Sequence, residues 1–243
     1  MQTKVSIVIP AFNEERLLAG SLRSIHAAAE AFSRLGWTWE SIVCDNNSTD
    51  RTAEIARAAG ARVVFEPVNQ IGRARNTGAA HAGGEWIIFV DADSYPSAEL
   101  FTEVAESMQS GSCVAGGSTV QFKACGAAVA FGIGTWNCIS RLAKWAAGSF
   151  IFCEAAVFRE VGGFNQDLYA SEEIDLFKHL KRIAKTQGKR IDILYRHPLL
   201  TSDRKMRLYG GRDHIRFLAK MLFSGGRALR NRKDCYTWYD GRR

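Results

Sequence analysis

The sequence predicts an α/β fold in which a mostly parallel central sheet is flanked by helices. Over the first 90 residues, short apolar runs alternate with segments of helical periodicity, which is the pattern of successive βα units. Polar clusters follow three of the four apolar runs, where the predicted strands end. The chain has 243 residues, 47% of them hydrophobic and 23% charged, so it is long enough for one large α/β domain or two small ones, with an ordinary globular composition.

The first part of the chain supplies four strands and three helices. Runs rich in Val and Ile predict the strands, and apolar residues three and four positions apart predict the helices. Pro10 should stop the first strand, Gly60 should end the second helix, and the pair Gly83-Gly84 should end the third. In order, the predicted elements are strand 5–9, helix 14–35, strand 41–44, helix 52–59, strand 62–65, helix 72–82 and strand 85–90.

The pattern is less regular after residue 96. An apolar segment at 127–147 predicts an amphipathic helix that is broken at Gly132 and Gly134. The end of the chain, from about Met206 to Arg232, is typical of a basic amphipathic helix. The other expected elements are helix 97–108, strand 114–122, an apolar segment 149–158, helix 171–185 and a short strand 191–194.

Charge and cysteine content narrow the function classes. The net charge is +7 and the cations are concentrated at the C-terminal end, which suits nucleic acid, an anionic membrane surface or a phosphorylated substrate. The six cysteines form no C-x-x-C pair, which favours buried free thiols in a reducing compartment. The N-terminus lacks the apolar region of a signal peptide, and no apolar run reaches the length of a membrane span. We therefore expect a cytoplasmic protein.

Asp91 and Asp93 follow the apolar run 86–90 directly. In open α/β sheets, ligands bind beyond the carboxyl ends of the strands, so both carboxylates would stand where a ligand binds. Because like charges repel, a hard cation such as Mg²⁺ or Mn²⁺ would offset them, and such ions usually bring substrate phosphates. The pair therefore indicates a metal–diphosphate site. The alternative is a solvated turn after a strand.

Five motifs in this order resemble the family 2 glycosyltransferases, which are inverting enzymes of the GT-A fold. The resemblance covers about residues 5–181. Two positions depart from the family pattern: Asn46 stands where the family often has a second Asp, and Glu173 replaces the usual Asp of an E-D pair. The segments that carry the resemblance are VSIVIPAFNE at 5–14, VCDNNSTD at 43–50, GRARNTG at 72–78, FVDAD at 89–93, and GGF at 162–164 with EEIDL at 172–176.

The resemblance implies the organisation of the chain and its reaction. A GT-A domain would cover residues 1–205, with a nucleotide-binding half at about 1–95 and an acceptor-side half at about 96–205. A basic amphipathic segment, 206–243, would follow. The implied reaction is the metal-dependent transfer of a sugar from a UDP- or GDP-sugar to an acceptor hydroxyl, with inversion.

On the donor side, the resemblance implies that Asp45 accepts a hydrogen bond from the base or ribose, although Asp also favours strand-end turns. Arg75 would face the diphosphate, because a guanidinium matches phosphate geometry. The alternative is that Arg75 lies on a solvated helix face, since Arg73 competes for this role. Asp93 would be the principal metal ligand, with Asp91 directed toward the ribose or a metal-bound water. The full predicted nucleotide-binding set is Pro10, Ala11, Asn13, Glu14, Asp45, Arg75, Asp91, Ala92 and Asp93.

On the acceptor side, Glu173 is the candidate general base and Glu172 is the next candidate. Inverting transfer needs one carboxylate within hydrogen-bond reach of the attacking hydroxyl. Both acids could instead be ordinary first-turn residues of a helix that is capped by Ser171. The resemblance implies that His197 or His214 could be a further metal ligand, with His197 as our candidate, although a lone His is more often structural. Arg204 could touch the diphosphate after a loop closes.

Several alternatives stay open at this level. A sugar-nucleotide-forming nucleotidyltransferase would need a Gly-rich basic loop after the first strand, where this chain has Ala-Phe-Asn-Glu at 11–14. Nucleic-acid binding is suggested by charge alone, and we expect none. The apolar region 131–145 and the basic end suggest a lipid-linked or membrane-proximal acceptor, with the protein peripheral at the inner face of the membrane. Both regions could equally be core and a homodimer surface.

Overall fold

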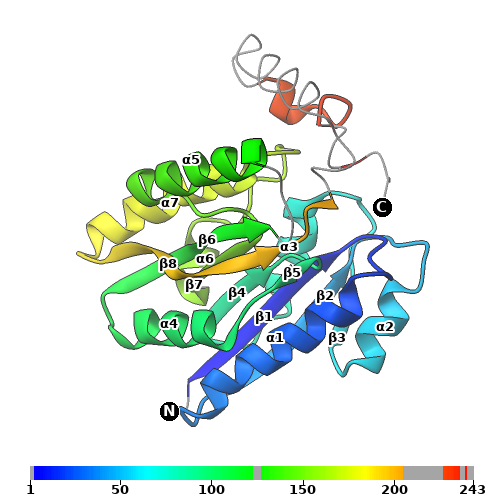
Figure 1. The fold of residues 1–243 in the computed structure, drawn as a ribbon, viewed down its shortest axis with the longest axis horizontal. Coiled ribbons are helices and arrows are strands. Elements are labelled where there is room, and N and C mark those ends of the chain that lie inside the picture. The colour runs from blue at the N-terminus through cyan, green and yellow to red at the C-terminus, as the bar shows by residue number, and fades with distance from the viewer. Residues whose placement is uncertain (1–2, 123–126, 205–226, 236–238, 240–243) are drawn as a thin grey trace.

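Eight strands of the computed structural model form one sheet, within the residues that the structure describes: 3–122, 127–204, 227–235 and 239. The order across the sheet is β3-β2-β1-β4-β7-β6-β8-β5 (Figure 1). The elements are β1 Lys4–Ala11, α1 Leu18–Ser33, β2 Thr38–Asp45, α2 Thr52–Ala58, β3 Arg62–Phe65, α3 Ile71–Ala80, β4 Trp86–Val90, β5 Ser94–Tyr95, α4 Ala98–Gln109, β6 Cys113–Phe122, α5 Ala127–Ala143, β7 Phe150–Glu154, α6 Ala155–Glu160, α7 Glu172–Thr186, β8 Arg190–Thr201 and the 3₁₀ turn η1 Arg227–Arg230.

The predicted α/β class is confirmed, and the sheet is mixed. Strands β3, β2, β1 and β4 run parallel, as the alternation of strands and helices predicts. Strand β7 then pairs antiparallel with both β4 and β6, while β8 is parallel to β6. Because β4 and β7 are neighbours, the sheet continues across the predicted boundary near residue 95. The division into two halves stays a prediction.

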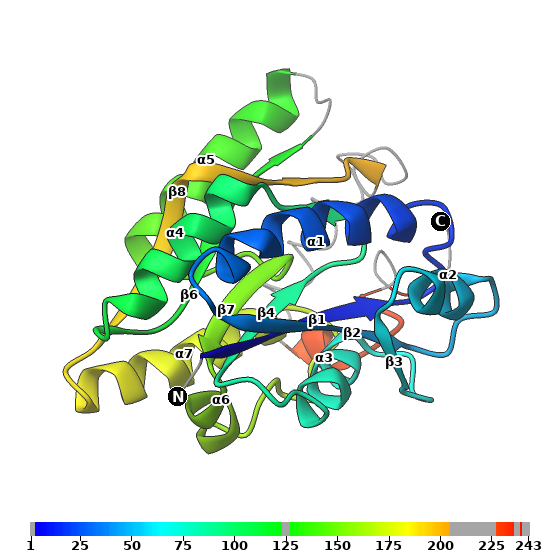
Figure 2. The ribbon, with the colours of Figure 1, turned by 90° about the horizontal axis from the view of Figure 1, so that it is seen from below.

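Helices cover both faces of the sheet (Figure 2). Helices α1 and α4 lie on one face, where Leu22 and Phe101 pack with Ile7. Helices α3, α6 and α7 lie on the other face, where Phe177 packs in the cluster that includes Val8. Neighbouring residues of β1 therefore enter different cores. This two-sided burial explains why the strands appear in the sequence as continuous apolar runs rather than as alternating patterns.

Several predicted boundaries in the first half were wrong; β2, for example, begins at Thr38 rather than at residue 41. Strand β1 does not stop at Pro10 but continues to Ala11. The Ala11 carbonyl accepts a hydrogen bond from the Asn46 amide at 2.8 Å, so Pro10 faces the other side, where pairing with β4 already ends at Val8. The missing N–H of Pro10 therefore costs no ladder bond. Helix α1 begins at Leu18 rather than near residue 14, after a turn held by the Glu14 carbonyl.

The second half departs further from the predicted pattern. Helix α5 is continuous from Ala127 to Ala143, so the predicted breaks at Gly132 and Gly134 are wrong. A glycine inside a helix costs only about 1 kcal/mol relative to alanine, which the rest of a 17-residue helix can offset. The apolar segment 149–158 divides into β7 and α6, and β8 extends far beyond the predicted 191–194. The predicted helix at 206–232 falls largely outside the described residues.

The described residues include no helix that is both long enough and apolar enough to cross a membrane. Five cysteines are described, and they are free thiols. Cys44, Cys113, Cys153 and Cys235 are buried, as predicted, but Cys138 is exposed. Burial raises the pKa of the Cys44 thiol to about 12, so this group stays protonated and inert at neutral pH.

Candidate active site

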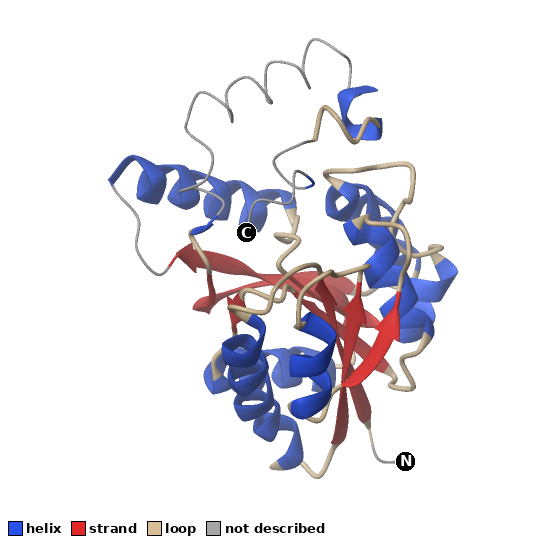
Figure 3. Cartoon of the chain, turned by 90° about the vertical axis from the view of Figure 1, so that its right-hand side faces the viewer, coloured by secondary structure: helices blue, strands red, loops and turns tan. Residues whose placement is uncertain are grey.

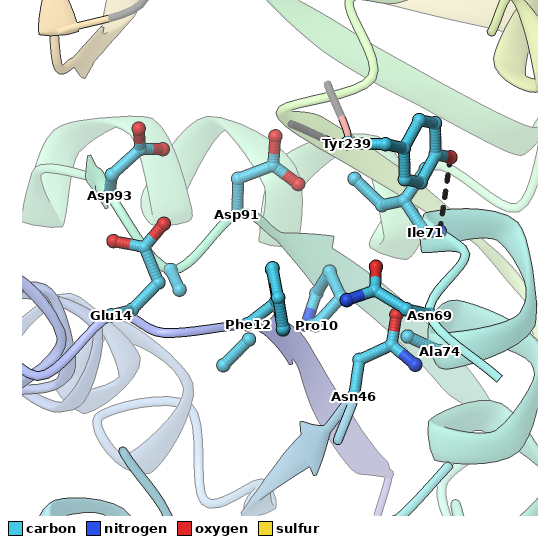
Figure 4. Close-up of a pocket in the computed structure, with 12 residues that line it drawn as sticks. Pro10, Phe12, Glu14, Asn46, Asn69, Ile71, Ala74, Asp91, Asp93 and Tyr239 are labelled. Carbon is cyan, nitrogen blue, oxygen red and sulfur yellow. Dashed lines mark hydrogen bonds between the residues drawn. The ribbon is translucent and has the colours of Figure 1, made fainter. Parts of the chain in front are cut away.

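The loops gather at the end of the sheet away from the start of β1 (Figure 3). There the polar ends of β1, β2 and β4 meet around one pocket, as the sequence predicts (Figure 4). The pocket encloses about 540 Å³ of space that is open to solvent. Six predicted nucleotide-binding residues line it: Pro10, Ala11, Glu14, Asp91, Ala92 and Asp93. The other lining residues, which the predicted set missed, are Phe12, Asn46, Asn69, Ile71, Ala74 and Tyr239.

The missed residues differ in how well the sequence signals them. Asn46 stands in the polar cluster after β2, so its position gave a usable signal. Asn46 is 3% exposed, and the Nδ2 group of its side chain donates to the Glu66 and Val68 carbonyls at 3.1 and 2.7 Å. Tyr239 comes from the far end of the chain, and no pattern connects it to the sheet. The Ile71 amide donates to the Tyr239 hydroxyl at 3.4 Å.

Asn13 and Asp45 hold the loops that frame the pocket and do not line it. Asn13 has a left-handed φ of 52°, and its carboxamide oxygen accepts from the Thr49 amide at 2.8 Å. Asp45 accepts from the Ser48 amide at 3.0 Å, which is the strand-end turn that was the alternative for this residue. Their predicted contacts with a nucleotide stay predictions.

Arg204 pairs with the two acids at one end of the pocket. Its guanidinium donates to both carboxylate oxygens of Glu14, at 2.8 and 2.5 Å, and lies 3.5 Å from Asp93 Oδ2. Burial works against the charge of Arg204, but the bonds to Glu14 and the charge of Asp93 outweigh it and raise the pKa of the guanidinium. The loop after β8 therefore places a cation between these two carboxylates.

Arg75 lies behind the pocket and bridges its two sides. It is 1% exposed, so the alternative of a solvated helix face is wrong. Its guanidinium donates to Glu172 Oε1 at 2.7 Å, to Asp91 Oδ1 at 3.0 Å and to the Gly148 carbonyl at 2.8 Å. These contacts join the end of β4 to the start of α7. The guanidinium is thus bonded to protein carboxylates, and its predicted contact with a diphosphate stays a prediction.

The two candidate bases at the start of α7 have different environments. Glu172 is 4% exposed and bonded to Arg75. Glu173 is half-buried, and an added Cβ on Gly148 would lie 3.6 Å from its carboxyl carbon. Burial raises the pKa of Glu173 to about 8, and the neighbouring charge of Glu172 acts in the same direction. Ser171 precedes the helix with a left-handed φ of 62°, and its side chain makes no cap bond, so the predicted capping is wrong.

His197 lies away from the acids at the pocket. Its Nδ1 atom is 2.5 Å from Glu103 Oε1 of α4. It stands on β8 four residues before Thr201, which pairs with Ser94 just after the D-x-D pair. A residue in a strand advances the chain by about 3.3 Å, so His197 is separated from that pairing by more than 10 Å. The structure thus places His197 with Glu103 rather than with Asp93, and its predicted role as a metal ligand has no support from this geometry. The other candidate histidine, His214, lies outside the described residues.

The carboxylates of the pocket fit a hard cation. Within the described ranges, no three His, Cys, Asp or Glu side chains gather into a protein-only cage. Mg²⁺ and Mn²⁺ favour oxygen ligands, and Mg²⁺ typically takes one or two carboxylates and completes its shell with water and substrate phosphates. Asp93 and Asp91 could supply those carboxylates. The guanidinium bound between Glu14 and Asp93 shows that this side of the pocket attracts positive charge.

The model of the protein family "Glycosyl transferase family 2" matches residues 6–147, which is more than half of the chain. The chain belongs to this family. The match contains all nine predicted donor-side residues, from Pro10 to Asp93, and ends before α7 and the acceptor-side acids. The family assignment also disfavours the nucleotidyltransferase alternative for this chain.

Two curated relatives are similar to part of this family 2 glycosyltransferase. An uncharacterized glycosyltransferase of Mycobacterium bovis is 38% identical over 103 residues, which cover 42% of this chain and 43% of the relative. A dolichyl-phosphate beta-glucosyltransferase of Trichomonas vaginalis is 33% identical over 113 residues, which cover 43% of this chain and 34% of the relative. These matches span less than half the length of the curated relatives.

Two solved structures share the fold of this glycosyltransferase. A mannosyltransferase from Pyrobaculum calidifontis, in complex with GDP-Man and Mn²⁺, has a TM-score of 0.69 and 18% identity, with 95% of this chain and 63% of that chain covered. Glucosyl-3-phosphoglycerate synthase from Mycobacterium tuberculosis, with Mn²⁺ and UDP, has a TM-score of 0.61 and 19% identity, with 96% and 80% covered. At these identities the likeness concerns the fold, which is of the GT-A type.

Proposed function

We propose that this protein transfers a sugar from a UDP- or GDP-sugar to an acceptor hydroxyl with inversion, and that Mg²⁺ or Mn²⁺ takes part. The proposal rests on one observation: a hydrogen-bond network through Arg75 connects a carboxylate in the pocket with the carboxylates at the start of α7. Asp91 stands in the pocket at the end of β4, and Glu172 and Glu173 stand at the start of α7, with the buried Arg75 between them. A donor in the pocket and an acceptor at α7 would meet beside this bridge.

On the donor side, the proposal assigns the nucleotide to the pocket rim formed by Pro10, Ala11 and Glu14. Asp93, with Asp91, would hold the cation, which offsets negative charge on the departing diphosphate. The fold neighbours support this donor class, because two of them are complexes with GDP-Man or UDP together with Mn²⁺. Arg204, which is bonded to Glu14, would have to shift its contacts when a cation and diphosphate enter.

On the acceptor side, Glu173 is the proposed general base. It takes the proton of the acceptor hydroxyl as that oxygen attacks the anomeric carbon from the face opposite the diphosphate. The bond from the anomeric carbon to the new oxygen forms as the bond to the diphosphate oxygen breaks, so the configuration inverts. Glu172 is held by Arg75, and this leaves Glu173 better placed to exchange a proton. A pKa of about 8 means that the basic form of Glu173 grows as the pH rises through neutrality.

The proposed acceptor is lipid-linked, with the protein acting in a cytoplasmic, reducing compartment at the inner face of the membrane. The similar relatives include proteins named for dolichyl-phosphate and undecaprenyl-phosphate, which supports this acceptor class. The free, mostly buried thiols support the compartment. A homodimer stays a prediction.

The experiment is a screen of UDP- and GDP-sugars for thermal stabilisation, with and without Mn²⁺, followed by an assay of nucleotide release. A ligand that binds the folded state alone raises the melting temperature. We expect Mn²⁺-dependent stabilisation by one nucleotide class and its loss in Asp93→Ala. Asp167→Asn is the matched control, because its side chain is 73% exposed and far from the D-x-D pair in the sequence. Unchanged turnover in Asp93→Ala would refute the site, and pyrophosphate release from a nucleoside triphosphate would refute the reaction.

A further inference from the structure

Helix α5 carries exposed apolar side chains on its outer side. Phe131 is 80% exposed and Leu142 is 81% exposed, and Ile139 between them is 43% exposed. Phe131, Cys138 and Leu142 are spaced by seven and four residues, so they lie along one face of the helix over about 16 Å. We refer to Phe131, Cys138, Ile139 and Leu142 as the α5 stripe.

The opposite face of α5 holds the helix in place. Ile133 and Trp136 pack against the main core. The Asn137 carboxamide bonds to both backbone groups of Val120 in β6, at 3.1 and 3.0 Å. Phe131 and Leu142, the most exposed residues of the stripe, therefore contribute little to attaching the helix. Apolar side chains this exposed, grouped on one helix face, are typical of an interaction surface.

The surroundings of the stripe are cationic. The sequence has no acid between Lys123 and Glu154, whereas Arg141 and Lys144 fall in this range. Arg141 and Lys144 also line the groove between α5 and β8, and no carboxylate lines it. Lys181 of α7 reaches the same end of α5, where its ammonium donates to the Ala143 carbonyl. A partner that suits this surface offers an apolar layer below a layer of negative charge.

The stripe is connected to the candidate active site. Five residues after α5 ends, Gly148 accepts the hydrogen bond from Arg75 and lies against the carboxyl group of Glu173. Figures 1 and 2 show α5 on the outside of the molecule, beyond the sheet. A surface that receives the stripe would thus lie on the acceptor side of the molecule.

We infer that the α5 stripe docks on an anionic lipid bilayer. Phe131 and Leu142 would enter the boundary between headgroups and acyl chains, and Arg141 and Lys144 would contact lipid phosphates. A second copy of the chain is a poorer partner, because its own net charge of +7 would bring two cationic rims together. Only the role that we assign to this docking rests on the proposed function: it would present Glu173 to a lipid-linked acceptor.

The experiment measures flotation of the full chain with two kinds of vesicle: phosphatidylcholine alone, and phosphatidylcholine mixed with phosphatidylglycerol. The test variant is Phe131→Ala/Leu142→Ala, whose side chains are too exposed to support the fold. We expect wild type to float with the anionic vesicles, and the variant to bind them roughly tenfold to a hundredfold more weakly, since both apolar groups are lost. Phe65→Ala is the matched control, because Phe65 is 57% exposed on β3.

The basic segment 206–243 is present in wild type and variant alike, so it cannot produce a difference between them. Arg141→Gln/Lys144→Gln should reduce the preference for anionic vesicles. Equal flotation of wild type and the Phe131/Leu142 variant would overturn the inference, and so would a dimer in solution that the variant dissociates. Stabilisation by nucleotide and Mn²⁺ reports separately on the proposed function: it should persist in the variant, and its absence in wild type would refute the glycosyl-transfer site while leaving the membrane result intact.

Discussion

Replacement of Arg75 by methionine tests the bridge between the donor and acceptor sides. The guanidinium side chain is 2% exposed and pairs with Glu172, 5% exposed, and with Asp91, 18% exposed. Methionine fills similar space but leaves both carboxylates without their cation. Removing one partner of a buried ion pair typically costs about 3–5 kcal/mol. For a chain of this size, this corresponds to a fall in melting temperature of roughly 10 °C at neutral pH.

The measurement is urea denaturation of wild type, Arg75→Met and Arg190→Met at several pH values. Arg190 is the matched control, because it also bonds an aspartate, Asp192 at 2.8 Å, but is 53% exposed. An exposed pair of this kind is worth less than about 1 kcal/mol. Acid should protonate the two stranded carboxylates and remove their charge. The difference in unfolding free energy between Arg75→Met and wild type should therefore shrink as the pH falls.

A second-site change sharpens this test. In Arg75→Met/Glu172→Gln, one of the stranded charges becomes a neutral amide, so the double variant should recover about 1 kcal/mol or more relative to Arg75→Met. The reasoning would be refuted if Arg75→Met cost no more than Arg190→Met. It would also be refuted if the loss were the same at acid and neutral pH, because the cost would then come from packing rather than from buried charge.

The remaining predictions concern Glu173 and two glycines. The pKa of Glu173 is raised to about 8 from 4.5, so wild type should lose stability as the pH rises between these values, and Glu173→Gln should lose less over the same range in denaturation experiments. The same variant should lower transfer by about a hundredfold or more. Gly116→Ala should cost roughly 1–3 kcal/mol, because its Cβ would lie 2.3 Å from the Asp192 carbonyl oxygen. Gly132→Ala meets nothing within 4 Å inside α5 and should gain about 0.5–1 kcal/mol, which thermal melts of the two variants would compare.

The sequence predicted the first half of the fold well because its signals there are local. A parallel strand buried on both faces is a continuous apolar run, and the polar residues after it mark the strand end. From these signals alone, the convergence of Glu14, Asn46 and Asp91 on one edge follows from topology. The predicted end of the first strand at Pro10 was wrong. Whether a proline interrupts a strand depends on which neighbouring strand its backbone nitrogen faces, and here this is set by the pairing of β1 with β2 and β4.

The second half was harder to predict because its structure depends on distant contacts. The continuity of α5 depends on the packing of Ile133 and Trp136 against the core, which outweighs the low helix propensity of Gly132 and Gly134. The long strand β8 pairs with β6, and the paired residues Cys113 and Arg190 are about 77 positions apart in the sequence. Neither contact leaves a periodic pattern in the sequence. His197 shows the same limit, because its partner Glu103 could not be identified from spacing.

The arrangement of charge gives a physical reason for choosing Glu173 over its neighbours as the base. Four other acids near the site are bonded to arginines: Glu14 and Asp93 to Arg204, and Asp91 and Glu172 to Arg75. Glu173 is the carboxyl whose pKa is raised toward neutrality. A general base is most effective when its pKa lies near the working pH, so the two arginines, by binding the neighbouring acids, leave proton transfer to Glu173.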